Sequence, residues 1–182
     1  MDTQTLDFTT GTSVIYGMHG KCCIKAIENR TVDNQSIPFY KLEVLKSTLS
    51  RSSRQDPAIW VPVDIARERG MRPPVNRDNA SVILAILADR EYYFSVHESW
   101  HLIKAQLEHS IRTEGAIGLA KVASYLFVLK RQQIVPSTEV ARMDENVMRL
   151  LLRELSEATG EPITLLEEKI NKGFRSKTLP DN

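Results

Sequence analysis

The 182-residue sequence contains only two cysteines and no long apolar run, and both shortages restrict what the protein can be. The longest apolar stretch, residues 82–88, is far too short to cross a bilayer. The first ten residues include Asp2 and Asp7 and lack a basic segment followed by an apolar one, so we expect no secretory signal. Cys22 and Cys23 are neighbours that cannot easily bridge each other, which fits a reducing compartment. We therefore expect a soluble, cytoplasmic protein that makes no membrane contact.

An excess of charge of one sign is also missing, because 24 basic residues stand against 23 acidic ones and the net charge is +1. A protein that binds nucleic acid on its own usually carries a clear basic surplus. Any contact with DNA would therefore be local, or delivered by a partner already bound to DNA. A phosphate-binding loop is missing too, since Cys22 follows Gly20-Lys21 and no glycine precedes them at P-loop spacing. We expect neither an NTPase nor another enzyme, and no cofactor.

The cysteine pair raises the question of a metal site. His19, Cys22 and Cys23 could supply three zinc ligands, but the second Cys/His pair of a zinc signature does not follow, which favours a structural role. Alternation along a strand would place Cys22, Ile24 and Ala26 on one face, with Cys22 in the core. We expect no bound metal.

The first 72 residues are typical of a small antiparallel barrel. Short β-branched and aromatic runs alternate with turn residues, including Asp33-Asn34. The predicted strands cover residues 14–16, 22–27, 39–45 and 59–63. Between the last two, the serine- and arginine-rich stretch from Ser47 to Pro57 lacks periodicity and is predicted to be an exposed loop.

The paired prolines Pro73-Pro74 mark a domain boundary, because they stop both ladders and helices. Beyond them the apolar spacing becomes helical, and we expect Asp78 to cap the first helix. Four more helices are predicted. The second begins near His97, and the third carries the apolar residues from Ile117 to Leu129. The fourth begins at Pro136-Ser137, and the fifth begins at Pro162. The predicted fold class is α+β in two domains, a β-barrel over 1–72 and an all-α helical bundle over 75–182.

Three spaced motifs stand out in the first domain: Phe8-x-x-Gly11-x-x-Val14-x-Tyr16-x-x-His19-Gly20, Ile27-Glu28-x-Arg30-Thr31 and Phe39-Tyr40-x-Leu42. Together they resemble the opening of the CarD/CdnL family of bacterial transcription regulators, a module that also occurs in the transcription-repair coupling factor. The missing nucleotide motor argues against that larger protein. The similarity continues through Gly70-Met71-Arg72 and into Trp100 with the following "KAQLEHSIRTEGAIGLAKVASYL".

The resemblance implies a Tudor-like N-terminal barrel that binds the β subunit of RNA polymerase. The family places an interface arginine in the context of Arg30, and Trp60 occupies a strand position where the family often has a basic or aliphatic residue. We assign both to the polymerase contact. The resemblance also implies a helical domain that touches promoter DNA at the upstream edge of the transcription bubble, where a tryptophan enters the minor groove and holds the promoter open.

We assign Trp100, His101 and Lys104 to this DNA contact, which we expect to be weak without polymerase because tethering supplies the local concentration. Family members place arginines directly after the tryptophan, whereas this chain has His101-Leu102-Ile103. We expect a monomer.

The spacing of Trp100, Ile103 and Leu107 is also that of a buried helix stripe. A DNA-entering role predicts a substantially exposed indole, and a core role predicts a buried one. Two functions remain open: a CarD-like transcription regulator that contacts polymerase and DNA, and a polymerase-binding or protein-interaction adaptor that does not bind DNA.

Overall fold

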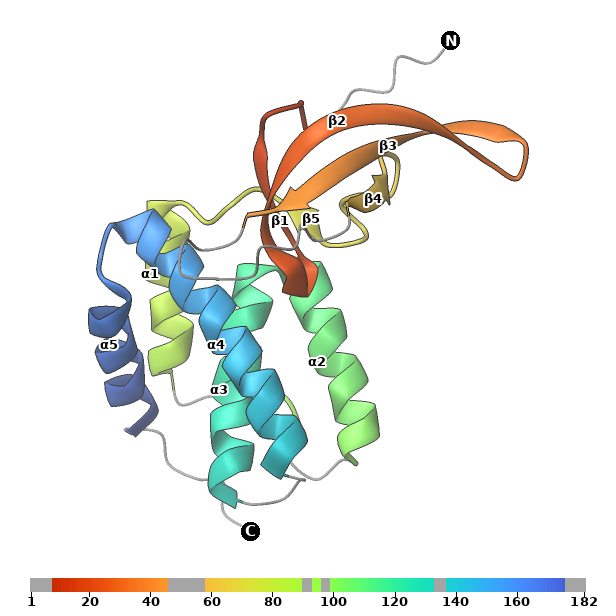
Figure 1. The fold of residues 1–182 in the computed structure, drawn as a ribbon. Helices are drawn as coiled ribbons and strands as arrows, with labels where there is room; N and C mark the ends of the chain where they lie inside the picture. Colours follow the sequence, from red (N-terminus) through yellow and green to blue (C-terminus); the bar gives the residue numbers. More distant parts are fainter. Residues whose placement is uncertain (1–7, 46–57, 90–92, 96–98, 133–136, 176–182) are drawn as a thin grey trace. The chain divides into compact units, whose positions relative to one another are not determined.

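The computed structural model describes residues 8–45, 58–89, 93–95, 99–132 and 137–175. The predicted loop over 47–57 lies outside these residues. The chain divides into two compact units, Met1–Pro74 and Val75–Asn182. Strands β1 to β5 precede helices α1 to α5, so the predicted α+β fold with a Tudor-like N-terminal part and a helical C-terminal part is confirmed (Figure 1).

The first unit is a five-stranded antiparallel sheet of order β4-β3-β2-β1-β5. Its strands are β1 (Ser13–Tyr16), β2 (Gly20–Val32), β3 (Gln35–Val44), β4 (Ile59–Pro62) and β5 (Met71–Arg72). A 3-10 turn over Gly17–His19 joins β1 to β2.

The hairpin of β2 and β3 extends beyond the other strands, as Figure 1 shows. Its two-residue turn is Asp33-Asn34, whose φ angles are 48° and 62°. Both residues therefore occupy the left-handed region that this tight hairpin turn requires, and Asp and Asn tolerate that region better than most residues. The turn predicted at these positions is confirmed.

A register shift between Ile24 and Ala26 changes which face of β2 points inward. Cys22 and Ile24 are fully buried, whereas Ala26 pairs with Lys41 and is only half-buried. The expectation that Ala26 shares a face with Cys22 was wrong, because simple alternation fails at a bulge. The other buried side chains of this core are Phe8, Val14, Tyr40, Leu42, Val61, Val63, Ala66 and Met71.

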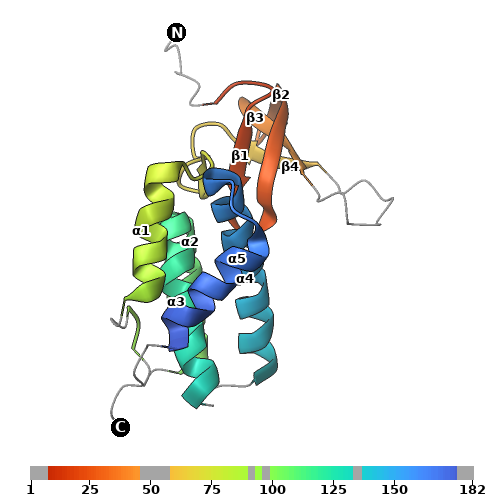
Figure 2. The same ribbon diagram turned by 90° about the vertical axis from the view of Figure 1, so that its left-hand side faces the viewer.

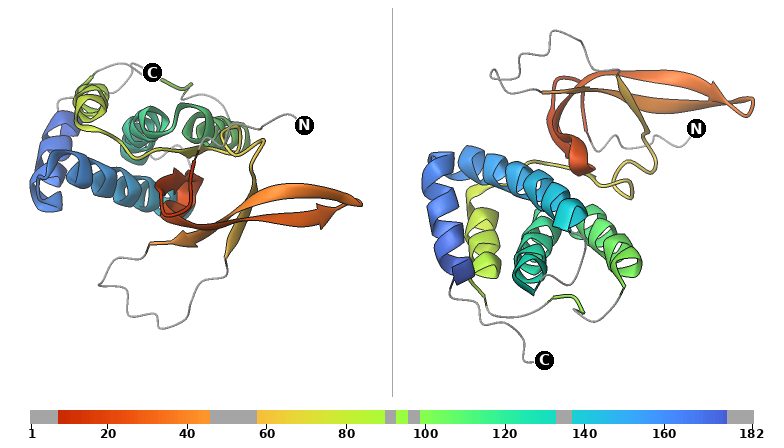
Figure 3. Two further views of the ribbon diagram at one scale, coloured as in Figure 1. Left: turned by 90° about the horizontal axis from the view of Figure 1, so that it is seen from above. Right: turned by 60° about the horizontal axis from the view of Figure 1, so that its bottom comes forward.

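The second unit consists of α1 (Arg77–Ala88), α2 (Trp100–Glu114), α3 (Ala116–Gln132), α4 (Ser137–Thr159) and α5 (Ile163–Arg175). Helix α3 contacts α1, α2 and α4 (Figure 2), and α5 lies alongside α1 (Figure 3). Their apolar faces enclose one core whose largest fully buried side chains are Ile83, Leu87, Ile103, Leu107, Leu119, Leu126, Leu129 and Leu151. None of the described helices is long and apolar enough to cross a membrane.

The helix starts refine the sequence-based expectations. The Asn76 side chain caps α1 by accepting a hydrogen bond from the Asn79 N–H at 2.8 Å, so the prediction of Asp78 as the cap was wrong. Asp78 instead lies in the first turn, where its charge favours the helix dipole. His97 and Pro136, at the expected starts of two other helices, lie outside the described residues, and the described helices begin at Trp100 and at Ser137.

Helices α2 and α3 approach each other closely at Gly118. A Cβ atom added there would lie 2.2 Å from the Ser110 carbonyl oxygen and 2.6 Å from its carbon. Only glycine fits this contact without moving backbone. The α2–α3 pair is thus held close together along the helix that carries Trp100.

Candidate functional site

The outer face of the N-terminal sheet carries a group of side chains that we call the sheet-face cluster, made of Glu28, Arg30, Lys41 and Trp60. Lys41 lies between the buried residues Tyr40 and Leu42 on β3, so its side chain points away from the core. Lys41 also pairs directly with Trp60 on β4, which places both side chains on the same face.

Two cations meet the indole ring of Trp60. The Arg30 Cζ atom lies 4.3 Å from the ring centroid, and the Lys41 Nζ atom lies 5.2 Å from it. Both distances are within the range of a cation–π interaction. The Lys41 ammonium is also 3.6 Å from the Glu28 carboxylate. The ring therefore holds two positive side chains that come from two different strands.

Arg30 is an exposed member of the sheet-face cluster, and its planar guanidinium forms hydrogen bonds in fixed directions. Within the described part of the chain it makes no hydrogen bond or ion pair, and its contact is the ring of Trp60. A guanidinium stacked on an aromatic face keeps its N–H edge available for a carboxylate, which it can bind with two parallel hydrogen bonds. The cluster is suited to hold an acidic side chain of another protein.

Sequence reasoning named two of the four members of this cluster. The structure brings Arg30 and Trp60 into contact, but their role in polymerase binding stays a prediction. Lys41 and Glu28 were missed. Alternation with Tyr40 and Leu42 could have placed Lys41 on the outer face of the sheet. Its pairing with Trp60 depends on the register between β3 and β4, which the sequence alone does not fix.

The second candidate region is the start of α2, where Trp100 is the first helical residue. Its side chain is half-buried and packs against the helical core, next to the buried Ile103. His101 is exposed, Lys104 is half-buried, and Leu102 is 58% exposed. The structure thus places the three predicted DNA-binding residues on the first two turns of one helix.

Trp100 has neither the fully buried nor the substantially exposed position that the two hypotheses required. Its indole Nε1 atom is buried and has no hydrogen-bond partner among the described residues. An indole in this position could enter DNA only after its side chain moves, so the wedge role stays a prediction.

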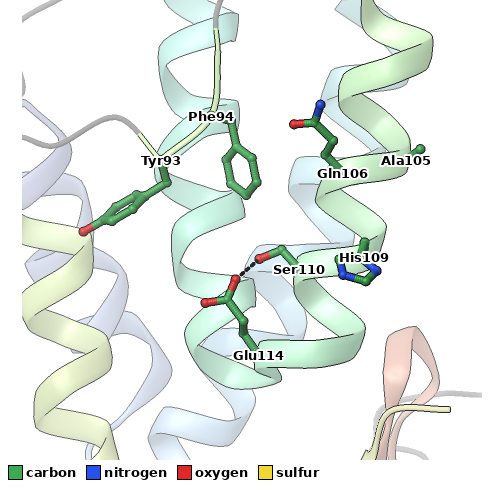
Figure 4. Close-up of a pocket in the computed structure, with 7 residues that line it drawn as sticks. All are labelled: Tyr93, Phe94, Ala105, Gln106, His109, Ser110 and Glu114. Atoms are coloured by element: carbon green, nitrogen blue, oxygen red, sulfur yellow. Dashed lines mark hydrogen bonds between the residues drawn. The ribbon is translucent and has the colours of Figure 1, made fainter. Parts of the chain in front are cut away.

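A hollow beside α2 has a volume of about 530 Å³. Figure 4 shows the side chains of Phe94 and Gln106 on either side of it, above the hydrogen-bonded pair Ser110 and Glu114. The other lining residues are Tyr93, Ala105 and His109. Neither the hollow nor its lining was predicted from the sequence, although Ser110 and Glu114 have the i, i+4 spacing of a helix pair.

Both carboxylate oxygens of Glu114 accept hydrogen bonds from side chains of the helical unit. Ser110 donates to one oxygen at 2.8 Å, and Lys121 on α3 donates to the other. Partial burial by itself would raise the pKa of Glu114, but the hydrogen bonds from Lys121 and Ser110, with the charges of Lys121 and His109, lower it overall. The Lys121 ammonium also lies 5.6 Å from the ring of Tyr93. This arrangement joins α2, α3 and the segment between α1 and α2, and we assign it no ligand.

The cysteine pair is split between the interior and the surface. Cys22 is fully buried, and its burial, together with the negative charge that the neighbouring Cys23 side chain carries when ionised, raises the pKa of Cys22 to about 11. Cys23 is half-buried, and the nearby Lys25 ammonium pairs with Glu43 at 2.6 Å. Among the described residues no group of three or more His, Cys, Asp and Glu side chains is arranged to hold a metal ion.

Comparison with known proteins bears on the N-terminal unit. No curated protein matches the chain significantly. The family model of the CarD-like/TRCF RID domain matches residues 8–75, which is well under half of the chain but covers all five strands. The N-terminal part of this chain is therefore a CarD-like/TRCF RID domain, an RNA polymerase β-interacting domain and not a catalytic one.

Proposed function

We propose that this protein is a CarD-like transcription regulator that binds the β subunit of RNA polymerase and modulates the stability of the promoter open complex. Residues 1–72 form the polymerase-interacting domain, and residues 75–182 form a helical domain that reaches promoter DNA. The protein acts as a monomer in the cytoplasm, where polymerase is found.

The observation that carries the polymerase contact is the stacking of Arg30 on Trp60, 4.3 Å from the ring centroid, on a domain of the polymerase-interacting type. The ring fixes one face of the guanidinium, so less conformational entropy is lost when its edge meets a carboxylate. Lys41 adds a second positive charge over the same ring. We propose that this cluster meets an acidic surface of the β subunit.

The sheet edges add a second possible mode of contact. Strands β4 and β5 lie at the two ends of the sheet order, and each pairs with one neighbour within the described strands. A strand of the partner could therefore extend the sheet through backbone hydrogen bonds. In this mode the sheet-face cluster would select the partner, while backbone pairing would supply part of the affinity.

The DNA contact rests on Trp100, His101 and Lys104 at the start of α2. The alternative function is a polymerase-binding or protein-interaction adaptor without DNA binding. Two observations favour it: the net charge is only +1, and the Nε1 atom of Trp100 is buried. Retention of the chain on open promoters distinguishes the two functions.

The polymerase contact is tested by capture of the full chain, of fragment 1–72 and of fragment 75–182 with the isolated β-subunit lobe. We expect the full chain and fragment 1–72 to be captured, because fragment 1–72 holds the sheet-face cluster and all but the last three residues of the RID domain match over residues 8–75. Capture of fragment 75–182 alone would contradict the proposal. Each fragment is first checked for folding by circular dichroism, so that loss of structure is recognised.

The promoter contact is tested by the lifetime of the open complex after addition of a competitor. If the protein is a regulator that contacts promoter DNA, the full chain should change the lifetime of the open complex and fragment 1–72 should not. An unchanged lifetime, with intact polymerase binding, would leave the adaptor function in its place.

A further inference from the structure

Near the tip of the β2–β3 hairpin, the outer edge of β2 is not paired with any strand that the structure describes. Strand β1 pairs with residues 20–23 of β2, and the backbone hydrogen bonds on that side end at Ile24. Residues 27–32 of β2 therefore have β3 on one side and, among the described strands, none on the other. This open edge, residues 27–32, belongs to the part of the hairpin that extends beyond the other strands (Figure 1).

The hairpin turn determines which backbone groups of β2 point to the open edge. Val32 and Gln35 flank the two-residue turn and pair with each other, so they form the first hydrogen-bonded pair of the ladder. Hydrogen-bonded and non-hydrogen-bonded pairs then alternate along the two strands. Every second residue of β2 consequently directs its N–H and C=O groups away from β3 and towards the open edge, namely Ile27, Asn29 and Thr31.

Pro38 supports this alternation and shows how the outer edge of β3 differs. It lies opposite Asn29, and its carbonyl accepts a hydrogen bond at 3.0 Å from the N–H of Val63, just beyond β4, so the carbonyl points away from β2. Proline has no N–H to donate, and a proline on an edge strand hinders pairing with a further strand. The outer edge of β3 is thus covered by β4 or interrupted by Pro38, whereas residues 27–32 contain no proline.

The exposed charges of β2 make the open edge complementary to itself. Glu28 and Arg30 flank Asn29, and both are exposed members of the sheet-face cluster. When two such edges pair antiparallel with Asn29 opposite Asn29, Glu28 of each copy lies directly opposite Arg30 of the other. These are non-hydrogen-bonded positions of the new pair, where facing side chains come closest. A second copy of the chain therefore fits the open edge by charge as well as by backbone.

The same charges select one register. In the register centred on Asn29, the outward N–H and C=O groups of Ile27 meet those of Thr31 in the other copy. A slide of two residues in one direction places Glu28 opposite Glu28, and a slide in the other direction places Arg30 opposite Arg30. Like charges directly opposite each other are destabilising, so both neighbouring registers are disfavoured.

We propose that two copies of this chain pair through residues 27–32 of β2 and form a weak, symmetric dimer that withholds Arg30 from other partners. The pairing continues the sheet of one copy into the sheet of the other. A single strand edge buries little surface, so the dimer is reversible and forms at high concentration. Glu28, which already lies 3.6 Å from the Lys41 ammonium, gains a second cation from the other copy. That the dimer excludes polymerase rests on the proposed function, in which the monomer is the acting form.

Self-association is tested by sedimentation velocity of the full chain from about 10 µM to about 1 mM. We expect a reversible equilibrium between monomer and dimer. Hydrogen exchange followed by NMR over the same concentrations should show the amides of Ile27, Asn29 and Thr31 exchanging more slowly as the dimer forms. The amide of Ser36, which points to the outer edge of β3, is the internal control and should not change. A chain that stays monomeric throughout would overturn the inference.

The pairing of Glu28 with Arg30 is tested by exchanging their charges. Glu28→Arg and Arg30→Glu should each raise the dissociation constant of the dimer at least about tenfold, because each change sets like charges opposite each other twice. An equal mixture of the two variants should restore the dimer, since the doubly basic edge of one complements the doubly acidic edge of the other. The double variant should also dimerise, and circular dichroism establishes that each chain is folded. Arg69→Glu, at an exposed position outside the open edge, should keep the dissociation constant within about threefold.

The outcomes separate this inference from the proposed function. Dimers that form equally well in both single variants, or a mixture that stays monomeric, would overturn the edge pairing. If the full chain binds the β-subunit lobe but stays monomeric, the dimer is wrong and the proposed function stands. If the full chain dimerises as expected but does not bind the lobe, the proposed function is wrong and the dimer stands. Added lobe should dissociate the dimer, and a complex that retains two paired copies would overturn the withholding of Arg30.

Discussion

Reversal of the charge at Arg30 is the sharpest test of the sheet-face cluster. In the free protein Arg30 is exposed and stacks on Trp60 at 4.3 Å, and an exposed cation–π contact is worth about 0.5–1 kcal/mol. Arg30→Glu should therefore lower the free energy of unfolding by no more than about 1 kcal/mol. The same change removes a charge-assisted hydrogen bond to the partner, worth roughly 1.5–3 kcal/mol, and adds repulsion.

The expected loss of binding is thus about 3 kcal/mol or more, which corresponds to a dissociation constant about 100-fold higher. Isothermal titration of the full chain with the β-subunit lobe measures this change, and urea unfolding measures stability in parallel. Arg30→Lys should show an intermediate loss, because an ammonium keeps the charge but not the two-pronged geometry.

Arg69→Glu is the matched control, since Arg69 is an exposed arginine of the same unit outside the sheet-face cluster. It should leave the dissociation constant within about threefold, because an exposed charge outside the contact contributes less than 1 kcal/mol. Equal losses for Arg30→Glu and Arg69→Glu would show that only overall charge matters. Unchanged binding of Arg30→Glu would refute the assignment of the cluster to the polymerase contact.

Three further predictions concern stability. Because burial raises the pKa of Cys22 from 9.0 to about 11, the folded state retains its thiol proton where the unfolded state loses it. The contribution of Cys22 to stability should therefore be constant below about pH 9 and fall by up to roughly 3 kcal/mol as the pH rises to about 11, and urea titrations of Cys22→Ala should lack this step. Gly118→Ala should lower stability by roughly 1–3 kcal/mol because its Cβ would collide with the Ser110 backbone, and an equal or higher melting temperature would contradict the tight helix contact. Trp100→Ala should cost about 1–2 kcal/mol, less than the roughly 3–5 kcal/mol of a fully buried tryptophan, because part of the lost packing is offset by removal of the unsatisfied N–H. A calorimetric loss of about 3 kcal/mol or more would show a pure core role.

The sequence alone determined the features that depend on neighbours along the chain. Alternating and helical apolar spacing located the helices and the first four strands but not the two-residue strand β5. Asp33-Asn34 located the hairpin turn, because backbone preferences there act over a few residues. The spaced motifs around Phe8, Gly11 and Arg30 indicated the domain type that the family match supports.

Tertiary structure decided what depends on residues distant in sequence. The bulge after Ile24 turned Ala26 outward, and the pairing of β3 with β4 brought Lys41 and Arg30 to the ring of Trp60. These outcomes depend on strand register, which is set by packing of a whole sheet and not by local preference.

The position of Trp100 was decided in the same way. Its spacing with Ile103 and Leu107 fits both a core stripe and a surface wedge, since periodicity reports which residues share a helix face and not how far the core extends along it. Only the packing of α2 against the helical core shows that the ring is half-covered and that its N–H is left without an acceptor among the described residues. Hydrogen-bond satisfaction is a property of the assembled interior, because the partner of a buried donor is supplied by whichever element packs beside it.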